Sequence, residues 1–175
     1  MAHEQLIRIS LAEQTLELLE DGVVQCRYAV STALNGPGEC SGSGCTPRGW
    51  HAIHAKIGAG VAVDTVFVGR EPTGEIYSAE LAQQQPDRDW ILTRILWLGG
   101  LEPEHNQGGQ VDTLSRYIYL HGCPDNAPMG VPGSHGCVRM RNADVVELFE
   151  RAREGTHVWI QEGPFDAATP RSARV

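Results

Sequence analysis

The sequence lacks the features that mark membrane proteins and disulfide-rich exported proteins. No apolar stretch approaches the about 20 residues that cross a bilayer. The first residues carry neither the basic segment nor the apolar run of a secretory signal. The five cysteines are an odd number at irregular spacing, without a C-x-x-C pair, so no disulfide framework is expected. We therefore expect a cytoplasmic protein with a free thiol. A chain trimmed of an export signal would look the same and would act in the periplasm.

Clusters of basic residues are also missing. The chain has 14 Lys and Arg against 22 Asp and Glu, a formal net charge of −8. Nucleic acids and anionic membranes bind clustered Lys and Arg, so neither is expected as a partner. Repeats and interdomain linkers are absent, and 175 residues suffice for one hydrophobic core. We expect one monomeric domain over residues 1–163 and a flexible tail over residues 164–175.

The chain is instead rich in short apolar segments with the two-residue period of β-strands. Residues 5–11 alternate in this way, and Asp21-Gly22 is a strong hairpin signal before a returning strand at residues 23–30. Residues 14–19 fit either a strand or a short helix. Further strands are expected at residues 50–57, 61–68, 90–98 (where helix is the alternative), 116–120 and 156–161.

Glycine, serine and proline predict loops at residues 31–49 and 99–115. Residues 70–89 are polar and are predicted to be loop, with a short helix expected at residues 78–85.

One clear helix is expected after the last cysteine. Asn142 suits its N-cap and Gly155 its C′ position. Its apolar side suits packing on a sheet and consists of Val145, Val146, Leu148, Phe149 and Ala152. Many short strands and one helix predict a mainly β sandwich or barrel-like fold.

Within residues 117–140, His121, His135 and Cys137 lie close together, each beside a glycine. A thiol needs a base to become a good nucleophile, and either His121 or His135 can hold Cys137 as a thiolate–imidazolium pair. His135 is two residues from the thiol, so contact requires a bend. The loop after His121 is long enough to fold back on it. Both histidines remain candidates from the residues alone.

The residues around Cys137 also suit an acyl-transfer reaction. The backbone N–H groups of His135, Gly136 and Cys137 can face one point, as an oxyanion requires. Arg139 follows two residues later and can hold a substrate carboxylate in a bidentate pair. A bond from Arg139 to a loop carbonyl is an equal alternative.

The remaining cysteines have simpler explanations. Cys26 and Cys123 are expected to be small buried apolar residues. Cys40 and Cys45, with the histidines at 51 and 54, have spacing that is poor for structural zinc. No metal or other cofactor is therefore expected.

The pattern H-G-x11-S-H-G-C-V-R-M, which begins at His121, resembles the signature of the L,D-transpeptidase (YkuD-type) catalytic domain. Residues 46–53, T-P-R-G-W-H-A-I, are similar to that family's T-P-x-G-x-x-x-I segment. The resemblance covers residues 5–162. It implies a mixed β-sandwich with a cradle-like cleft and a short helix after the catalytic cysteine loop.

The resemblance also implies roles for individual residues. Cys137 matches the nucleophile, and His121 matches the general base, with the Gly122 carbonyl orienting its imidazole. The implied site consists of Cys137, His121, Gly122, His135 and Gly136 for catalysis, and of Ser134 and Arg139 for substrate binding.

The implied substrate is a peptidoglycan tetrapeptide stem. The thiolate attacks the carbonyl at the L-centre of the third residue, a meso-diaminopimelate or a lysine; D-alanine leaves and a thioester remains. An amine acceptor gives a cross-link or a protein attachment, and water gives a tripeptide.

Without an export signal, water or a free D-amino acid is the expected acceptor. The chain would then be a cytoplasmic L,D-carboxypeptidase in muropeptide recycling. A non-catalytic muropeptide-binding module with the same fold is the alternative. Residues 70–115 are expected to form a lid that restricts the acceptor, with polar contacts from Arg94 or Asp112.

Overall fold

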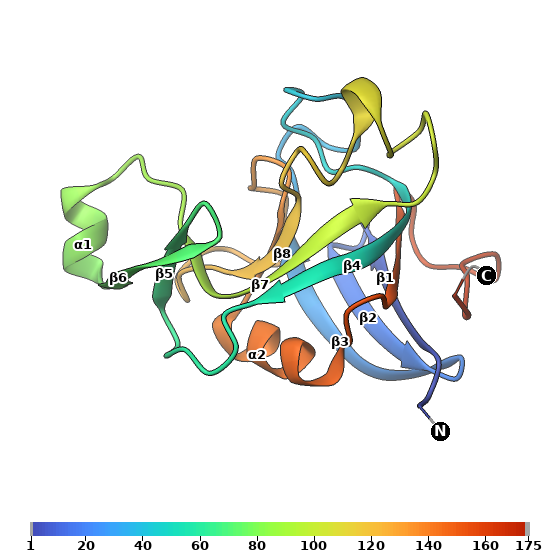
Figure 1. The fold of residues 1–175 in the computed structure, drawn as a ribbon, viewed down its shortest axis with the longest axis horizontal. Helices are drawn as coiled ribbons and strands as arrows, with labels where there is room; N and C mark the ends of the chain where they lie inside the picture. Colours follow the sequence, from blue (N-terminus) through green and yellow to red (C-terminus); the bar gives the residue numbers. More distant parts are fainter. Residues whose placement is uncertain (1, 174–175) are drawn as a thin grey trace.

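The computed structural model describes residues 2–173, which are built mainly from β-strands (Figure 1). The strands are β1 (Gln5–Ser10), β2 (Thr15–Glu20), β3 (Val23–Ser31), β4 (Gly49–Ile57), β5 (Thr65–Val68), β6 (Glu71–Ile76), β7 (Ile91–Gly100), β8 (Tyr119–Gly122), β9 (Val138–Met140) and β10 (His157–Gln161). The helices are α1 (Ala79–Gln84) and α2 (Asn142–Arg151), with a 3₁₀ turn at Gly109–Val111. The predicted mainly β fold with a short helix after the cysteine loop is confirmed.

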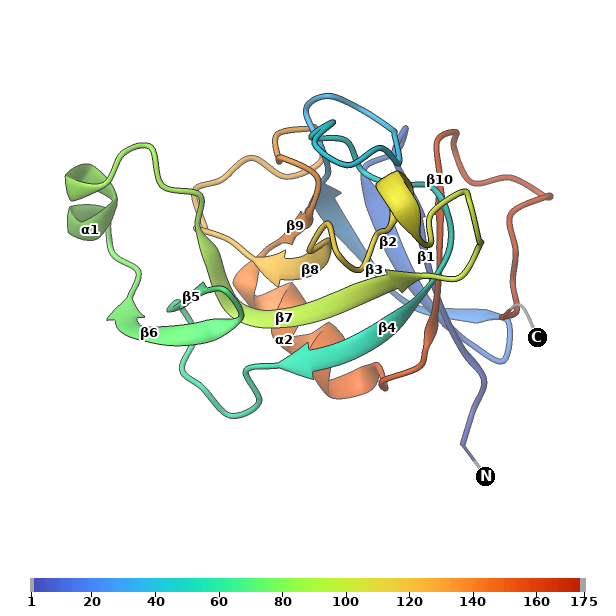
Figure 2. The same ribbon diagram turned by 45° about the horizontal axis from the view of Figure 1, so that its top comes forward.

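The strands form one mixed sheet that closes on itself. The order runs β4-β10-β1-β2-β3-β9-β8-β7, and β7 pairs back with β4. Two pairs, β1–β10 and β8–β9, are parallel. The β5–β6 hairpin joins the ring only through β5 and β7. Together with α1 it extends away from the ring (Figure 2). The closed ring leaves this hairpin and its helix as the outlying part of the fold.

Local sequence explains the hairpin that joins β2 to β3. Asp21 and Gly22 have φ angles of 48° and 78°, as a two-residue type I′ turn requires. The turn places β3 against β2 in an antiparallel pair, with one register shift between Leu18 and Leu19. Residues 14–19, open between strand and helix, therefore lie mostly in a strand. The strand alternative also holds for residues 90–98, most of which lie in β7.

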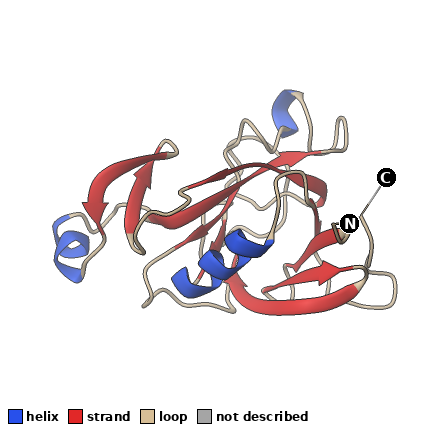
Figure 3. Cartoon of the chain, turned by 60° about the horizontal axis from the view of Figure 1, so that its bottom comes forward, coloured by secondary structure: helices blue, strands red, loops and turns tan. Residues whose placement is uncertain are grey.

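The main core fills the ring and continues to α2, which lies along one side of the sheet (Figure 3). Val145, Leu148 and Phe149 are the apolar side chains that α2 buries. Leu120 of β8 and Val138 of β9 are fully buried in the same core. Each such side chain contributes about 1.5–3 kcal/mol of burial free energy. The two strands that flank the cysteine loop are therefore anchored firmly.

Both predicted caps of α2 are wrong. Arg141 is the N-cap residue and makes no side-chain capping bond, while Asn142 is the first helical residue. The Asn142 amide instead donates to the carboxylates of Asp64 and Asp125, so tertiary contacts override its capping preference. The helix ends at Arg151, and Gly155 has its positive φ of 84° in the turn that follows.

Residues 70–115 do not form one lid. Part of the predicted loop is strand β6, which the low strand propensity of Pro72 and Gly74 concealed. The short helix is confirmed as α1, with Ser78 as its N-cap. The next segment is β7, a central strand of the ring. Arg94 is buried and donates to the carbonyl oxygens of Val61 and Thr93.

Two other predicted strands are displaced. Of residues 61–68, only Thr65–Val68 is strand. The strand expected at residues 116–120 occupies Tyr119–Gly122, because Tyr117 adopts a positive φ of 55° that interrupts extended backbone.

The segment predicted as a tail is described as far as Ala173 and contains neither helix nor strand. It lies against the first strands: the Arg8 guanidinium is over the Phe165 ring and donates to the Pro170 carbonyl oxygen. Its flexibility and the domain boundary at residue 163 stay predictions. No helix within residues 2–173 is long and apolar enough to span a bilayer.

Candidate active site

The parallel pair β8–β9 brings together the two halves of the cysteine motif. His121 of β8 lies opposite Arg139 of β9 in the strand register. Because side chains alternate along a strand, Tyr119, His121, Cys137 and Arg139 share one face, while Leu120 and Val138 enter the core. The predicted fold-back of the loop after His121 is confirmed.

The Cys137 thiol is held by the backbone on both sides. Its Sγ accepts the Tyr119 N–H at 3.3 Å, and its S–H donates to the Tyr117 carbonyl oxygen at 3.4 Å. Burial raises the pKa of the Cys137 thiol to about 11, although the Tyr119 N–H opposes the shift. The resting group is therefore a protonated, half-buried thiol at neutral pH.

His121 is almost completely buried, with 1% of its surface exposed. Its Nδ1 lies 2.7 Å from the Gly122 carbonyl oxygen. A carbonyl only accepts hydrogen bonds, so Nδ1 carries the proton and Nε2 is left as the base. Burial lowers the pKa of His121, opposed by the Gly122 bond. The two pKa shifts favour a neutral thiol and a neutral imidazole over the thiolate–imidazolium pair expected from the sequence.

The turn before Cys137 is braced from within. The Ser134 hydroxyl donates to the Cys137 carbonyl oxygen and accepts the Gly136 N–H. Thr46 is fully buried and its hydroxyl donates to the Gly136 carbonyl oxygen at 2.9 Å. It also accepts the Ala33 N–H. The T-P-x-G segment therefore fixes the cysteine turn, although Thr46 had no role assigned from the sequence.

Gly136 is required by its conformation. Its φ is +133°, and a Cβ there would lie 3.2 Å from the Cys45 carbonyl oxygen and 3.3 Å from Ile118 Cδ1. The sequence predicts three N–H donors for the oxyanion hole. Because the Gly136 N–H already donates to the Ser134 hydroxyl, the N–H groups of His135 and Cys137 are the two that remain as candidate donors.

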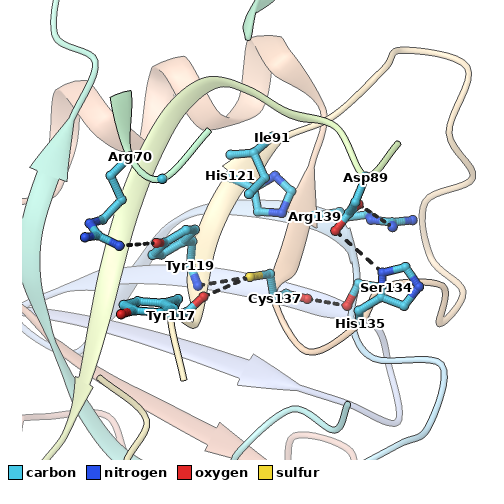
Figure 4. Close-up of a pocket in the computed structure, with 11 residues that line it drawn as sticks. Arg70, Asp89, Ile91, Tyr117, Tyr119, His121, Ser134, His135, Cys137 and Arg139 are labelled. Atoms are coloured by element: carbon cyan, nitrogen blue, oxygen red, sulfur yellow. Dashed lines mark hydrogen bonds and ion pairs between the residues drawn. The ribbon is translucent and has the colours of Figure 1, made fainter. Parts of the chain in front are cut away.

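A cavity of about 480 Å³ opens over the thiol. Its lining includes five of the predicted site residues, namely His121, Ser134, His135, Cys137 and Arg139. Gly122 and Gly136 contribute from behind it, through a carbonyl oxygen and backbone conformation. The predicted residues therefore converge on one cavity, with the thiol between its two ends (Figure 4).

At one end of the cavity, Asp89 joins two of the predicted residues. Its carboxylate lies 3.1 Å from Arg139 Nη2 and 3.5 Å from His135 Nδ1. The His135 side chain is 78% exposed, whereas His121 is buried and lines the cavity together with Cys137. This difference favours His121 as the base and gives His135 a place at the rim.

Sequence reasoning missed Asp89 and, at the other end of the cavity, Arg70, Tyr117 and Tyr119. The Arg70 guanidinium lies over the rings of Trp97 and Tyr117, with centroid distances of 4.6 and 4.9 Å. The two-residue β5–β6 turn that holds it has positive φ at Gly69 and Arg70. Gly69-Arg70 before E-P-T-G is a turn signal in the sequence, but this signal does not indicate that Arg70 lies near the thiol.

The other cysteines and histidines lie elsewhere. Both ring nitrogens of His51 are hydrogen-bonded, to the Gly49 carbonyl oxygen and to Thr113 Oγ1. Cys123 is buried as expected, whereas Cys26 is only partly buried. Asp112 bonds the backbone of its own loop and, like Arg94, does not line the thiol cavity.

Comparison with known proteins identifies the family of the chain. The profile of the YkuD family, the L,D-transpeptidase catalytic domain, matches residues 4–160. The chain therefore belongs to the YkuD family of L,D-transpeptidase catalytic domains.

Two bacterial relatives are similar in sequence. Probable L,D-transpeptidase YbiS of Escherichia coli (strain K12) is 37% identical over 98 residues, which cover 56% of this chain and 29% of that protein. Probable L,D-transpeptidase ErfK/SrfK of Salmonella typhimurium is 30% identical over 120 residues, covering 68% of this chain and 34% of that protein. The chain thus spans about a third of the length of these relatives.

Solved structures share the fold at low sequence identity. L,D-transpeptidase 3 from Mycobacterium tuberculosis has a TM-score of 0.58 and 17% identity, covering 92% of this chain and 62% of that one. An L,D-transpeptidase of Enterococcus faecium has a TM-score of 0.55 and 15% identity, covering 90% of this chain and 50% of that one.

Proposed function

We propose that the chain catalyses cysteine-dependent acyl transfer on peptidoglycan tetrapeptide stems. One observation carries the proposal: Cys137 and buried His121 line the same cavity, and the bond from His121 Nδ1 to the Gly122 carbonyl oxygen leaves Nε2 as the base. A nucleophile beside an oriented base is the arrangement that acyl transfer requires. Family membership supports the peptide stem as the substrate class.

The reaction starts from a neutral pair. Since the pKa of Cys137 is raised and that of His121 is lowered, the proton leaves the thiol during attack rather than before it. His121 Nε2 takes this proton as Sγ bonds to the carbonyl carbon of the third residue. The resulting oxyanion accepts hydrogen bonds from the N–H groups of His135 and Cys137. Such preorganised donors stabilise an oxyanion better than water does.

Collapse of this intermediate breaks the C–N bond to D-alanine. His121 returns the proton to the leaving amine, and the acyl group remains on Sγ as a thioester. In the second half, His121 accepts a proton from the incoming acceptor, whose oxygen or nitrogen attacks the thioester carbon. The C–S bond breaks and the thiol regains its proton.

The acceptor decides the product. Water gives a tripeptide, which would make the chain an L,D-carboxypeptidase suited to muropeptide recycling. An amine gives a cross-link or an exchanged terminal residue. A cytoplasmic location and hydrolysis stay predictions, and both acceptors are tested by one incubation.

The test incubates the protein with a tetrapeptide muropeptide, with and without an added D-amino acid, and identifies products by mass. Tripeptide alone indicates hydrolysis, and an exchanged tetrapeptide or a dimer indicates transpeptidation. Cys137→Ala should abolish every product. Cys40→Ser, at an exposed cysteine that does not line the cavity, is the matched control and should keep full activity. Binding without turnover in the unaltered protein would support the non-catalytic alternative instead.

A further inference from the structure

The cavity over Cys137 has a cationic end that neither the motif nor the proposed mechanism uses. Arg70 lines this end, while Asp89, His135 and Arg139 lie at the other (Figure 4). The guanidinium is held in place by the rings of Trp97 and Tyr117 and by a 3.1 Å bond from Nη1 to the Tyr119 hydroxyl oxygen. It is thus a positioned cation rather than a freely moving surface side chain.

Arg70 differs from Arg139 in its electrostatic surroundings. Arg139 already has a carboxylate partner, Asp89, within the cavity, and its binding of a substrate carboxylate stays a prediction. Within residues 2–173, Arg70 forms no ion pair, and the Tyr119 hydroxyl is its only hydrogen-bond partner. Most of its five N–H donors therefore remain for a ligand. A guanidinium fork matches a carboxylate in geometry and charge.

The distance between Arg70 and the thiol determines which carboxylate of a peptide stem can reach Arg70 while the reacting carbonyl lies at the thiol. Tyr119 spans the interval, because its N–H reaches Cys137 Sγ and its hydroxyl reaches Arg70. The two groups are thus separated by about the length of one tyrosine side chain. The carboxylate of the terminal D-alanine is joined to the reacting carbonyl through one nitrogen and one carbon, which is too short. The distal carboxylate of a diaminopimelate side chain lies a full side chain away, which fits.

We propose that Arg70 binds the side-chain carboxylate of the third stem residue and makes the enzyme prefer diaminopimelate over lysine at that position. The methylene chain of this residue lies along the rings of Tyr117 and Tyr119 in this arrangement. The proposal rests on the proposed function and names the substrate that it selects. Arg70 is a specificity residue, since it does not touch the reacting atoms.

The experiment compares four tetrapeptides that differ in one group: diaminopimelate, its side-chain carboxamide, lysine, and diaminopimelate followed by D-alaninamide. Turnover is measured with the unaltered protein, Arg70→Gln and Arg70→Lys. Arg88→Gln is the matched control, because Arg88 also lies over an aromatic ring, Trp90, but is paired with Glu75 and does not line the thiol cavity. Dissociation constants are measured in parallel on a Cys137→Ala background, which does not need turnover.

We expect the unaltered protein and Arg88→Gln to prefer the diaminopimelate acid by about ten- to hundredfold in KM, as for a hydrogen bond to a charged group. Arg70→Gln should lose this preference by weakening only the two peptides with a free side-chain carboxylate. Arg70→Lys should keep part of it. Because the comparison is made between substrates on one protein, a general loss of folding would lower all four equally.

Three results would overturn the inference. The first is equal binding of the acid, carboxamide and lysine peptides by the Cys137→Ala protein. The second is an equal loss of turnover on all four peptides in Arg70→Gln. The third is an Arg70 effect that depends on the D-alanine carboxylate instead of the side-chain carboxylate. Absence of turnover in the unaltered protein, with the binding preference intact, would count against the proposed function and leave the carboxylate site supported.

Discussion

The two walls of the cavity are held in different ways. The thiol wall consists of β8, β9 and the turn at residues 134–137, and it is fixed by buried backbone bonds and by Thr46. The insert wall consists of residues 69–91, which leave the ring between β5 and β7. It is joined to the thiol wall by exposed or half-buried groups such as Asp89, which is 44% exposed. This contrast suggests that the thiol wall performs the chemistry and the insert wall selects the substrate.

The largest effect should come from the histidine of the thiol wall. His121→Ala removes the proton acceptor and should lower kcat by roughly 10²–10⁴-fold, the usual contribution of a general base. His135→Ala, at the rim facing the insert, should leave kcat nearly unchanged. Rates of D-alanine release measure both variants. Equal losses in the two variants would remove the distinction between the walls.

The pH dependence of alkylation sharpens the picture of the thiol wall. Because burial raises the pKa of Cys137 to about 11, its thiolate fraction should rise about tenfold per pH unit between about pH 7 and 10. The rate of iodoacetamide modification, followed by mass on the peptide containing Cys137, should rise in parallel. A rate that is already constant from pH 6 to 9 would indicate a preformed thiolate–imidazolium pair instead.

The turn of the thiol wall should tolerate little change. Gly136→Ala places a Cβ against the Cys45 carbonyl oxygen in a backbone region that side chains rarely adopt, which should cost about 1–3 kcal/mol of stability. Gly130→Ala is the control, since Gly130 has a positive φ of 79° but open space around its Cβ position. Urea unfolding should show the larger loss for Gly136→Ala, together with lower activity. A larger loss for Gly130→Ala would mean that the close contacts do not matter.

The smallest effect is expected at the junction of the walls. Asp89→Asn removes the carboxylate that pairs with Arg139, and a half-exposed ion pair contributes only about 0.2–1 kcal/mol. KM should therefore change by up to about fivefold while kcat is retained. Asp87→Asn, on the same segment but outside the cavity lining, should change neither. A large loss of kcat in Asp89→Asn would place this carboxylate in the chemistry.

The same contrast explains what could be predicted from the sequence. Strand alternation and Asp21-Gly22 are local signals, so the strands at residues 5–11 and 23–30 and the turn before the second of them were predicted correctly. The thiol wall was also predicted, because His121 and the S-H-G-C turn lie within one short stretch. The convergence of these residues needed only a loop that folds back.

The insert wall could not be predicted because its contacts are long-range. Asp89 meets Arg139 across 50 positions, and Arg70 meets Tyr119 across 49. Neither pair leaves a periodic or motif-like trace. The caps of α2 failed for a related reason: Asn142 has capping chemistry, but its amide is taken by Asp64 and Asp125. Local preference was overridden by tertiary contacts.

The most direct test of the account is the covalent intermediate itself. The protein is mixed with a diaminopimelate tetrapeptide, quenched in acid within seconds, and digested for mass mapping. We predict a thioester carrying the substrate minus D-alanine on the peptide that contains Cys137. Products formed without any such adduct, or an adduct on Cys40 or Cys45 instead, would contradict the assignment of acyl transfer to the thiol wall.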